Sequence, residues 1–339
     1  MNDNHPLGLV VGLSNDAHHA DPSVGSSFLK VFQRSPLHAW AEYLDPEREP
    51  KDSKKFRIGR AWHCAVFEPS EFERRYAAGH DAHPSTNRAK LLASVLAGEI
   101  SPVDLVGVPD DLKPTSKEGK ALYAEIEARG EVPVTETDRA FVREWLPKLE
   151  GRDVLPADTI SDVLTMARIA RSLPISRVVF DQLAEHVRCE VSMFIRDADT
   201  GLRLKIRPDL AVMPCTPFPN GLIIDGKSTV DASPAVFGRQ VWNLDYGLQA
   251  AFYTRVFQQA VGTSGRPAFV WLAQEKERPF ASKYYAAGDD LLQHYDAKIA
   301  ALLPRVAQCH ASGIWPGYGD NVETLAMPAW AQKLIQEAA

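Results

Sequence analysis

The stretch RPDLAVMPCTPFPNGLIIDGKST, residues 207–229, puts charged side chains at the ends of segments that are otherwise apolar. Asp225 and Lys227 close the apolar run Leu222–Ile224, and Asp209 closes an alternating stretch before a proline-rich loop. Side chains alternate between the two faces of a strand, so Asp225 and Lys227 lie on the same side. Burial and mutual repulsion both disfavour two neighbouring carboxylates. The stretch therefore predicts a functional site rather than a feature that serves folding alone.

The residues before this stretch predict a β-hairpin. The segments 189–197 and 201–213 alternate polar and apolar residues, and the turn Asp197–Gly201 joins them. Period-two alternation on both sides of a turn rich in aspartate and glycine is a hairpin signal. If the second of these strands neighbours the strand over 222–227, Asp209 comes close to Asp225 and Lys227.

The rest of the chain supplies helices and two further strands. We predict one helix over 56–76, a long helix over 234–260, and strands over 269–275 and 282–288. Residues 79–118 fit no clear pattern beyond a short helix, and they are expected to be an insertion or a loop. The order strand–strand–strand–helix–strand, flanked by helices, predicts an α/β fold with a mixed sheet flanked by helices.

The domain organisation is predicted to be simple. Residues 1–25 lack the basic region and long apolar core of a signal peptide, so we expect a flexible leader. Residues 26–339 are expected to form a single domain. Its part over 26–180 is mainly helical and carries His63, and its part over 187–290 is the catalytic sheet core.

Composition narrows the function classes. The chain has 339 residues, 45% hydrophobic and 24% charged, which is ordinary for a globular protein. Its net charge of -6 means that any nucleic-acid site must be a local basic patch. Four widely spaced cysteines without a CxxC pair argue against a zinc ribbon, an iron–sulfur cluster or a disulfide framework, and they favour the cytoplasm. No apolar run approaches the ~18 residues of a membrane span, so no membrane association is expected.

A hard divalent cation would relieve the repulsion between Asp209 and Asp225. Mg²⁺ favours one or two carboxylates together with water and phosphate oxygens. Lys227 beside them can orient or deprotonate a water, or stabilise charge on a phosphate, and Glu190 can add a further carboxylate. Each residue also has an ordinary interpretation, such as a salt bridge at a strand end, a turn aspartate or a solvent-facing acid. Their occurrence together and in this order favours phosphodiester hydrolysis.

Six blocks of the sequence resemble the PD-(D/E)XK nuclease superfamily, which has a restriction-endonuclease-like core. More closely, they resemble the RecE-type exodeoxyribonuclease VIII group, related to lambda-type exonucleases and RecB-type nuclease domains. The resemblance spans roughly residues 24–290, but residues 79–111 do not match it. The blocks, in chain order, are SSFLKVFQRSPLHAWAEYLDP, GRAWHCAVFEP, KEGKALYAE, CEVSMFIRDADTGLRLKIRPD, LIIDGKSTVDA and YGLQAAFY.

The resemblance implies a role for each residue of the predicted site. His63, in the G-x-A-x-H-C block, would help to bind the metal from a helix beside the sheet. Asp209 and Asp225 would be the metal carboxylates, and Lys227 would be the catalytic lysine. Glu190 is the acid before the hairpin and would join the catalytic set.

Two further groups of residues are predicted to support DNA binding. Gln249 and Tyr253 match the Q-x-x-x-Y motif of the resembled family, and Tyr246 shares their helix face. Packing of this helix on the sheet is an equally good explanation for Tyr253. A basic stripe on the second hairpin strand could grip phosphates without reading bases, or could be a solvated strand face. It consists of Arg203, Lys205 and Arg207.

The expected function follows from the resemblance. It implies a Mg²⁺-dependent exonuclease, with Mn²⁺ as a substitute, that degrades linear double-stranded DNA from 5′ to 3′ in DNA recombination or repair. It also implies a homo-oligomeric ring and a single-strand annealing protein as a partner. Two alternatives stay open: a single-strand or structure-specific endonuclease on the same fold, and a catalytically silent DNA- or partner-binding module.

Overall fold

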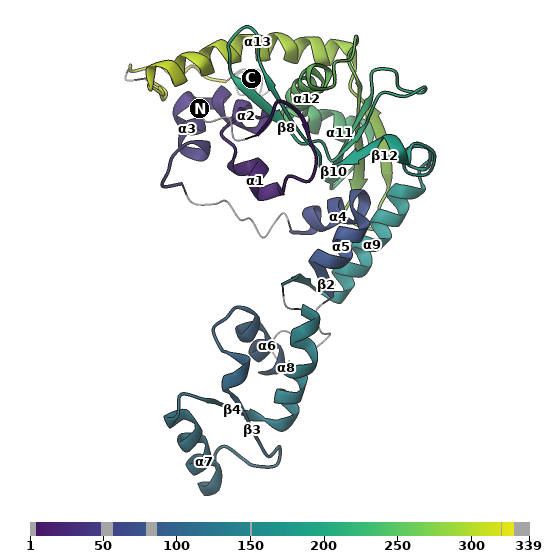
Figure 1. Ribbon diagram of the computed structural model, residues 1–339. Helices are drawn as coiled ribbons and strands as arrows, with labels where there is room; N and C mark the ends of the chain where they lie inside the picture. The colour runs from purple at the N-terminus through teal and green to yellow at the C-terminus, as the bar shows by residue number, and fades with distance from the viewer. Residues whose placement is uncertain (1–4, 49–56, 79–86, 150, 320, 329–339) are drawn as a thin grey trace, which may run out of the picture.

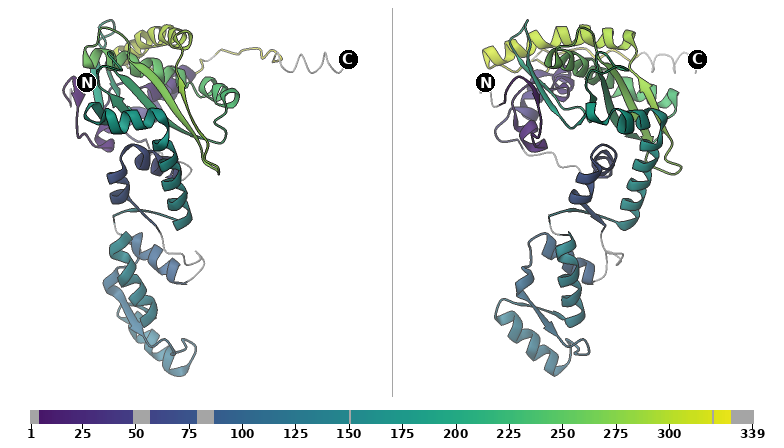
Figure 2. Two further views of the ribbon diagram at one scale, coloured as in Figure 1. Left: turned by 90° about the vertical axis from the view of Figure 1, so that its right-hand side faces the viewer. Right: turned by 45° about the vertical axis from the view of Figure 1, so that its right-hand side comes forward.

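The computed structural model describes residues 5–48, 57–78, 87–149, 151–319 and 321–328. These residues form two bodies, a larger one built around a sheet and a smaller one of residues 87–149 that stands away from it (Figures 1 and 2). Residues 1–4 of the predicted leader and residues 329–339 of the predicted domain lie outside the described residues.

A five-stranded mixed sheet forms the centre of the larger body. Its strand order is β12-β11-β10-β9-β6. The central strand β10 runs parallel to β11 and antiparallel to β9, so the predicted mixed α/β fold is confirmed. The strands are β6 (Val187–Cys189), β9 (Leu210–Val212), β10 (Leu222–Thr229), β11 (Ala268–Glu275) and β12 (Ser282–Ala286).

Helices cover both faces of this sheet. On one face Ile223 and Trp271 pack among side chains from α2 (Ser26–Arg34), α12 (Tyr246–Val261) and α13 (Asp289–Ser312). On the other face Ile224 and Leu272 pack among side chains from α4 (Arg57–Phe67) and α9 (Ala157–Ser172). A strand buried on both faces reads as a continuous apolar run. The apolar run of β10 ends at Ile224, and the charged Asp225 and Lys227 follow within the same strand.

The predicted hairpin is confirmed, but its two strands are shorter than predicted. Strands β7 (Ser192–Arg196) and β8 (Arg203–Ile206) pair with each other and belong to a second sheet of order β1-β7-β8. The predicted strands continue instead as β6 and β9 in the central sheet. The breaks fall at Glu190, whose backbone is left-handed at φ 50°, and at Pro208, which has no N–H to donate. Both chain segments thus change sheets beside the predicted site.

The N-terminal segment, residues 5–24, is packed against this second sheet. Strand β1 (Gly8–Val10) pairs antiparallel with β7, and α1 (Asn15–Ala20) is capped by the Ser14 side chain. Val24 is buried and bonds to β8 through its backbone. The prediction of a flexible leader is therefore wrong for the described part of residues 1–25. This segment is ordered because β1 pairs with the edge of β7 that β8 leaves open.

Two predicted helices are each split into two. The helix over 56–76 consists of α4 and α5 (Pro69–Arg75), because proline at a first helical position starts a new helix and cannot continue the previous one. The helix over 234–260 consists of α11 (Pro234–Asn243) and α12, separated where Asp245 adopts a left-handed backbone.

Two hydrophobic clusters hold the smaller body together, formed among its helices α6 (Asn87–Leu96) and α8 (Glu136–Leu149) and its strands, and one of them includes Ala77 and Val154 from the connection to the larger body. Parallel pairing of β2 (Tyr76–Ala78) and β5 (Asp153–Leu155) connects it to the larger body. The predicted single domain over 26–339 therefore contains two bodies. Its remaining elements are β3 (Leu105–Val108), α7 (Lys117–Ala128) and β4 (Val132–Thr135).

Among the described residues, no helix combines the length and apolar character needed to cross a bilayer. The four cysteines, all within the described ranges, are unpaired.

Candidate active site at the edge of the central sheet

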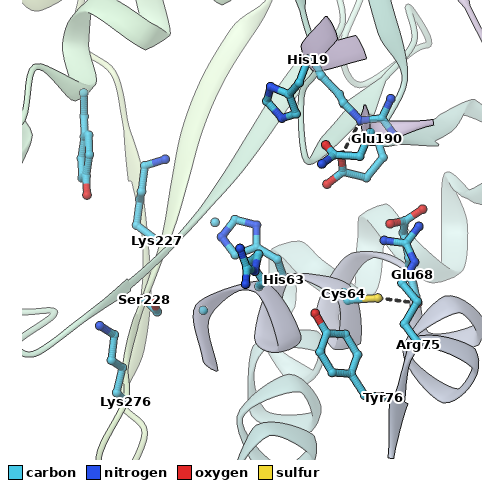
Figure 3. Close-up of a pocket in the computed structure, with 16 residues that line it drawn as sticks. His19, His63, Cys64, Glu68, Arg75, Tyr76, Glu190, Lys227, Ser228 and Lys276 are labelled. Atoms are coloured by element: carbon cyan, nitrogen blue, oxygen red, sulfur yellow. Dashed lines mark hydrogen bonds and ion pairs between the residues drawn. The ribbon is translucent and has the colours of Figure 1, made fainter. Parts of the chain in front are cut away.

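A cavity of about 480 Å³ opens where the central sheet, the second sheet and α4 meet. Figure 3 shows Lys227, Ser228 and Lys276 along one wall and Glu68, Arg75 and Tyr76 opposite, with His63 between them. The side chains and backbone that line the cavity belong to Asn15, His19, Gly59, Arg60, His63, Cys64, Glu68, Arg75, Tyr76, Glu190, Arg207, Gly226, Lys227, Ser228, Tyr246 and Lys276.

Asp209 is held in place by two donors. Its Oδ2 lies 3.2 Å from Nδ1 of His63, and it accepts a hydrogen bond of 2.7 Å from the backbone N–H of Gly226. Burial raises the pKa of Asp209, but His63, Lys227 and the N–H of Gly226 together outweigh burial, and the net shift is downward. Burial likewise lowers the pKa of His63, and the Asp209 carboxylate turns the net shift upward. Asp209 and His63 therefore form a charge-assisted pair beside the cavity.

Asp225 sits between a lysine and a glutamine. Its Oδ2 lies 2.5 Å from Nζ of Lys227, and its Oδ1 accepts a hydrogen bond of 2.7 Å from Nε2 of Gln249. Nζ of Lys227 also donates to Oε1 of Gln249 at 3.1 Å. Asp225 is almost fully buried, and the Lys227 ammonium is the contact that its Oδ2 makes. The three side chains form a closed triangle on α12 and β10.

The pKa shifts of Asp225 and Lys227 show that burial and repulsion between carboxylates disfavour the charged form of Asp225. Burial, and then repulsion from Asp209, raises the pKa of Asp225, although Lys227 opposes both effects. Burial lowers the pKa of Lys227, but the attraction of Asp225 and Asp209 outweighs it and the net shift is upward. Two carboxylates that repel each other in a desolvated place are the arrangement that a cation relieves.

Helix α4 reaches the site because a glycine leaves room for it. A Cβ on Gly226, between Asp225 and Lys227, would lie 2.9 Å from the ring of Phe67 and 3.0 Å from that of Trp62. Nε1 of Trp62 donates to Oε1 of Gln274 on β11 at 2.5 Å, which fixes the helix against the sheet. His63, the next residue along α4, is thereby placed beside Asp209.

Glu190 reaches the same cavity through the break between β6 and β7. Its backbone N–H donates to the carbonyl of Asp209 at 3.2 Å, and its Oε2 accepts from Nε of Arg207 at 2.8 Å. Burial, followed by repulsion from Asp209, raises the pKa of Glu190 to about 7, against the opposing effect of Arg207. Glu190 is thus a third carboxylate near the pair of aspartates, partly neutral at pH 7.

The donor set suits a hard divalent cation. Within the described ranges, no three His, Cys, Asp or Glu side chains gather around one point. His63 is instead engaged with Asp209, while Asp225 is engaged with Lys227. Two carboxylates suffice for Mg²⁺, which keeps several of its waters. The burial of Asp225 and the repulsion between the two aspartates fit such an ion.

The predicted basic stripe is not open to DNA. Arg203 is only 3% exposed, and its guanidinium donates to Oγ of Ser23 and to the carbonyl of His5. Nζ of Lys205 donates to the carbonyls of His18 and Asp21, at 2.6 Å each. The prediction that both residues grip phosphates is therefore wrong, because the N-terminal segment covers them.

Arg207, the third residue of the stripe, behaves differently. It lines the cavity while donating to Glu190 and to the carbonyl of Leu13 at 2.8 Å. Of the predicted stripe, only this residue remains a candidate for contact with a substrate.

Docking of the N-terminal segment is expected to weaken in acid. Burial first, and the charge of Lys205 second, lower the pKa of His18 to about 3, and its Nδ1 lies 3.0 Å from Oγ of Ser192. The unfolded residue titrates near 6.5, so only the unfolded state binds this proton between these values. The contribution of neutral His18 to the stability of the fold is fully present above pH 6.5 and is lost as the pH falls towards 3. Over this range the unfolding constant rises by up to about tenfold per pH unit.

Thermal melts of the wild type and of His18→Gln at pH 7.5 and pH 5 measure this contribution. The wild type should lose more stability than the variant on acidification. Equal losses would show that His18 is not the group responsible.

The three residues predicted on one face of α12 have different roles in the structure. Gln249 contacts both Asp225 and Lys227, and the ring of Tyr246 lines the cavity. The hydroxyl of Tyr253 donates to the carbonyl of Arg207 at 3.4 Å, and its ring packs on Phe269 in the core. Tyr253 thus supports the chain next to Asp209, which agrees with the packing alternative for this residue.

Several cavity residues carried no signal that singled them out in the sequence. His19 and Asn15 belong to the segment expected to be a leader, and Glu68 and Arg75 stand at either end of α5. Lys276 follows β11, next to the end of β10. Only the tertiary contacts of their elements bring them to the site.

Residues 178–328 match a protein family described as a PDDEXK-like domain of unknown function. The matched stretch contains Glu190, Asp209, Asp225 and Lys227. It begins after His63, so that residue lies outside the match. This part of the chain is therefore similar to a PDDEXK-like domain, which agrees with the resemblance to the PD-(D/E)XK nuclease superfamily. The narrower resemblance to the RecE-type group remains a prediction.

Two solved structures show distant similarity. A crystal structure of a "Putative exonuclease" from Eubacterium rectale aligns with 96% of this chain and 98% of its own, at 14% sequence identity and a TM-score of 0.45. The crystal structure of SSO0001 aligns with 76% of this chain and 86% of its own, at 10% identity and a TM-score of 0.27. Both similarities are too distant to carry information on activity. No curated protein matches the chain.

Proposed function

We propose that the protein is a metal-dependent exodeoxyribonuclease that hydrolyses phosphodiester bonds of linear double-stranded DNA, from 5′ to 3′, in recombination or repair. One observation supports it above the others. His63 and Lys227 line one cavity, and each holds an aspartate beside it: His63 contacts Asp209, and Lys227 contacts Asp225. The PDDEXK-like match over residues 178–328 supports the same class.

In the proposed reaction each residue has a defined task. Asp209 and Asp225 would hold Mg²⁺, or Mn²⁺ in its place, and His63 would join them after giving up its proton and its contact with Asp209. The bound ion would supply Lewis-acid polarisation of a phosphate oxygen. Lys227 orients the attacking water and neutralises charge that develops on the phosphate. Gln249 holds Lys227 and Asp225 in register through its two hydrogen bonds.

Degradation of a linear duplex tests this proposal. With Mg²⁺, a linear 5′-phosphorylated duplex should disappear while a closed circular duplex stays intact, and EDTA should stop the reaction. Cutting of the circle would replace the exonuclease with an endonuclease. Failure to degrade any DNA with Mg²⁺ or Mn²⁺ would contradict the proposed activity.

A further inference from the structure

Two lysines approach the ring of Tyr246 at the rim of the cavity. Nζ of Lys227 lies 4.8 Å from the ring centroid, and Nζ of Lys30 lies 5.2 Å from it. Lys30 comes from α2, which packs against α12 on the far side of the sheet from α4. The hydroxyl of Tyr246 accepts a hydrogen bond from Gln240 at 3.4 Å, which holds the ring in place. Helix α2 thus adds a cation that the predicted site does not include.

Lys30 has no carboxylate partner, unlike three other lysines that lie over aromatic rings. Lys148 and Lys298 also lie over aromatic rings, and each has a carboxylate oxygen at 2.9 Å or 3.4 Å. Lys227 has Asp225 at 2.5 Å. For Lys30, no carboxylate of the described residues lies within 4.0 Å, although its side chain is half-buried.

The acids nearest to Lys30 are already engaged. Asp225 is held by Lys227 and Gln249. Asp245 accepts from Tyr295 at 3.0 Å and lies 3.4 Å from Nζ of Lys298. Neither carboxylate can turn to Lys30 without giving up these partners.

Lys30 therefore lacks a counter-ion that its surroundings call for. Burial, and then the charge of Lys227, lower its pKa to about 8, so most of it is still protonated at pH 7. A half-buried ammonium without an anion is unfavourable, and a phosphate oxygen would satisfy both its charge and its N–H groups. The cavity rim beside Lys227 is where a nucleic-acid backbone would supply one.

We propose that Lys30 and Tyr246 form a second phosphate-binding position, which takes the backbone phosphate next to the scissile one. The inference rests on the proposed function, because a polynucleotide is the ligand that presents neighbouring phosphates. Lys227 serves the reacting phosphate and Lys30 the flanking one. This position takes over the role that Arg203 and Lys205 cannot fill, because the N-terminal segment occupies both side chains.

The salt dependence of DNA binding tests the proposal. Fluorescence anisotropy is measured with a labelled 20-bp duplex, with Ca²⁺ in place of Mg²⁺ and NaCl from 50 to 200 mM. Lys30→Met and Lys30→Gln should each bind about tenfold more weakly at the lower salt, and the slope of log K against log salt should fall by about one. Lys30→Arg, which keeps the charge, should retain the wild-type slope.

Lys283→Met is the matched control. Lys283 also lies over a tyrosine ring, that of Tyr285 at 5.6 Å, but it is exposed on β12, and Tyr285 does not line the cavity as Tyr246 does. Its slope and affinity should equal those of the wild type. Melting curves of all variants show whether the fold is kept, and two substitutions at Lys30 guard against one that fails to fold.

The outcomes separate the inference from the proposed function. If folded Lys30→Met and Lys30→Gln bind the duplex with the affinity and salt slope of the wild type, the phosphate position is overturned. The nuclease proposal is not affected by that result. A wild type that neither binds nor degrades DNA overturns both.

Discussion

Replacing Lys227 with methionine is expected to lower the turnover number for DNA hydrolysis by about 10²–10³-fold. Methionine keeps most of the buried stem but removes the ammonium that lies 2.5 Å from Asp225 and 3.1 Å from Oε1 of Gln249. The charge that develops on the phosphate then has no cation from β10 to neutralise it. Steady-state degradation of a linear duplex, with the DNA at saturating concentration, gives the turnover number directly.

Stability must be measured on the same variant. Loss of Lys227 leaves the Asp225 carboxyl buried without its ion pair, and its already raised pKa should rise further. The melting temperature of Lys227→Met is therefore expected to change, and activity should be compared only where the variant is folded. A folded variant with wild-type turnover would make Lys227 a structural partner of Asp225 and nothing more. Lys283→Met provides the control for removing a lysine elsewhere.

Replacing Arg203 with leucine is expected to lower the free energy of unfolding by about 2–4 kcal/mol. The guanidinium is 3% exposed, donates to Ser23 and to the carbonyl of His5, and lies 5.0 Å from the ring centroid of Phe194. Its removal leaves buried acceptors of the N-terminal segment without a donor. Urea unfolding of the two proteins gives the difference.

Salt dependence separates this structural role from the predicted phosphate contact. Arg203→Leu should keep the wild-type slope of DNA binding against salt, because Arg203 is covered and contacts no phosphate. A slope lower by about one would restore the basic stripe as a DNA contact. Arg196→Leu is the control, since Arg196 pairs with Arg203 across the hairpin but is exposed. It should change the unfolding free energy by less than about 1 kcal/mol.

The sequence by itself determined the parts of this protein that depend on short-range patterns. Alternation around Asp197–Gly201 predicted the hairpin, and the apolar run before Asp225 predicted a strand over 222–227. The spacing of Asp225 and Lys227 put them on one side of that strand, where the structure has them. These features were accessible because neighbours within a few residues decide strand periodicity, turn formation and side-chain direction.

Only the tertiary structure decided what surrounds these residues. It moved both hairpin strands between sheets at Glu190 and Pro208, covered Arg203 with the N-terminal segment, and brought Lys30 to the ring of Tyr246. Each of these outcomes depends on contacts between residues far apart in the chain. The sequence does not show whether the partner of a basic side chain on a strand is solvent, a backbone carbonyl or a phosphate. The docking of elements chooses among these partners, because burial and the competition for hydrogen bonds are settled only when the whole chain has packed.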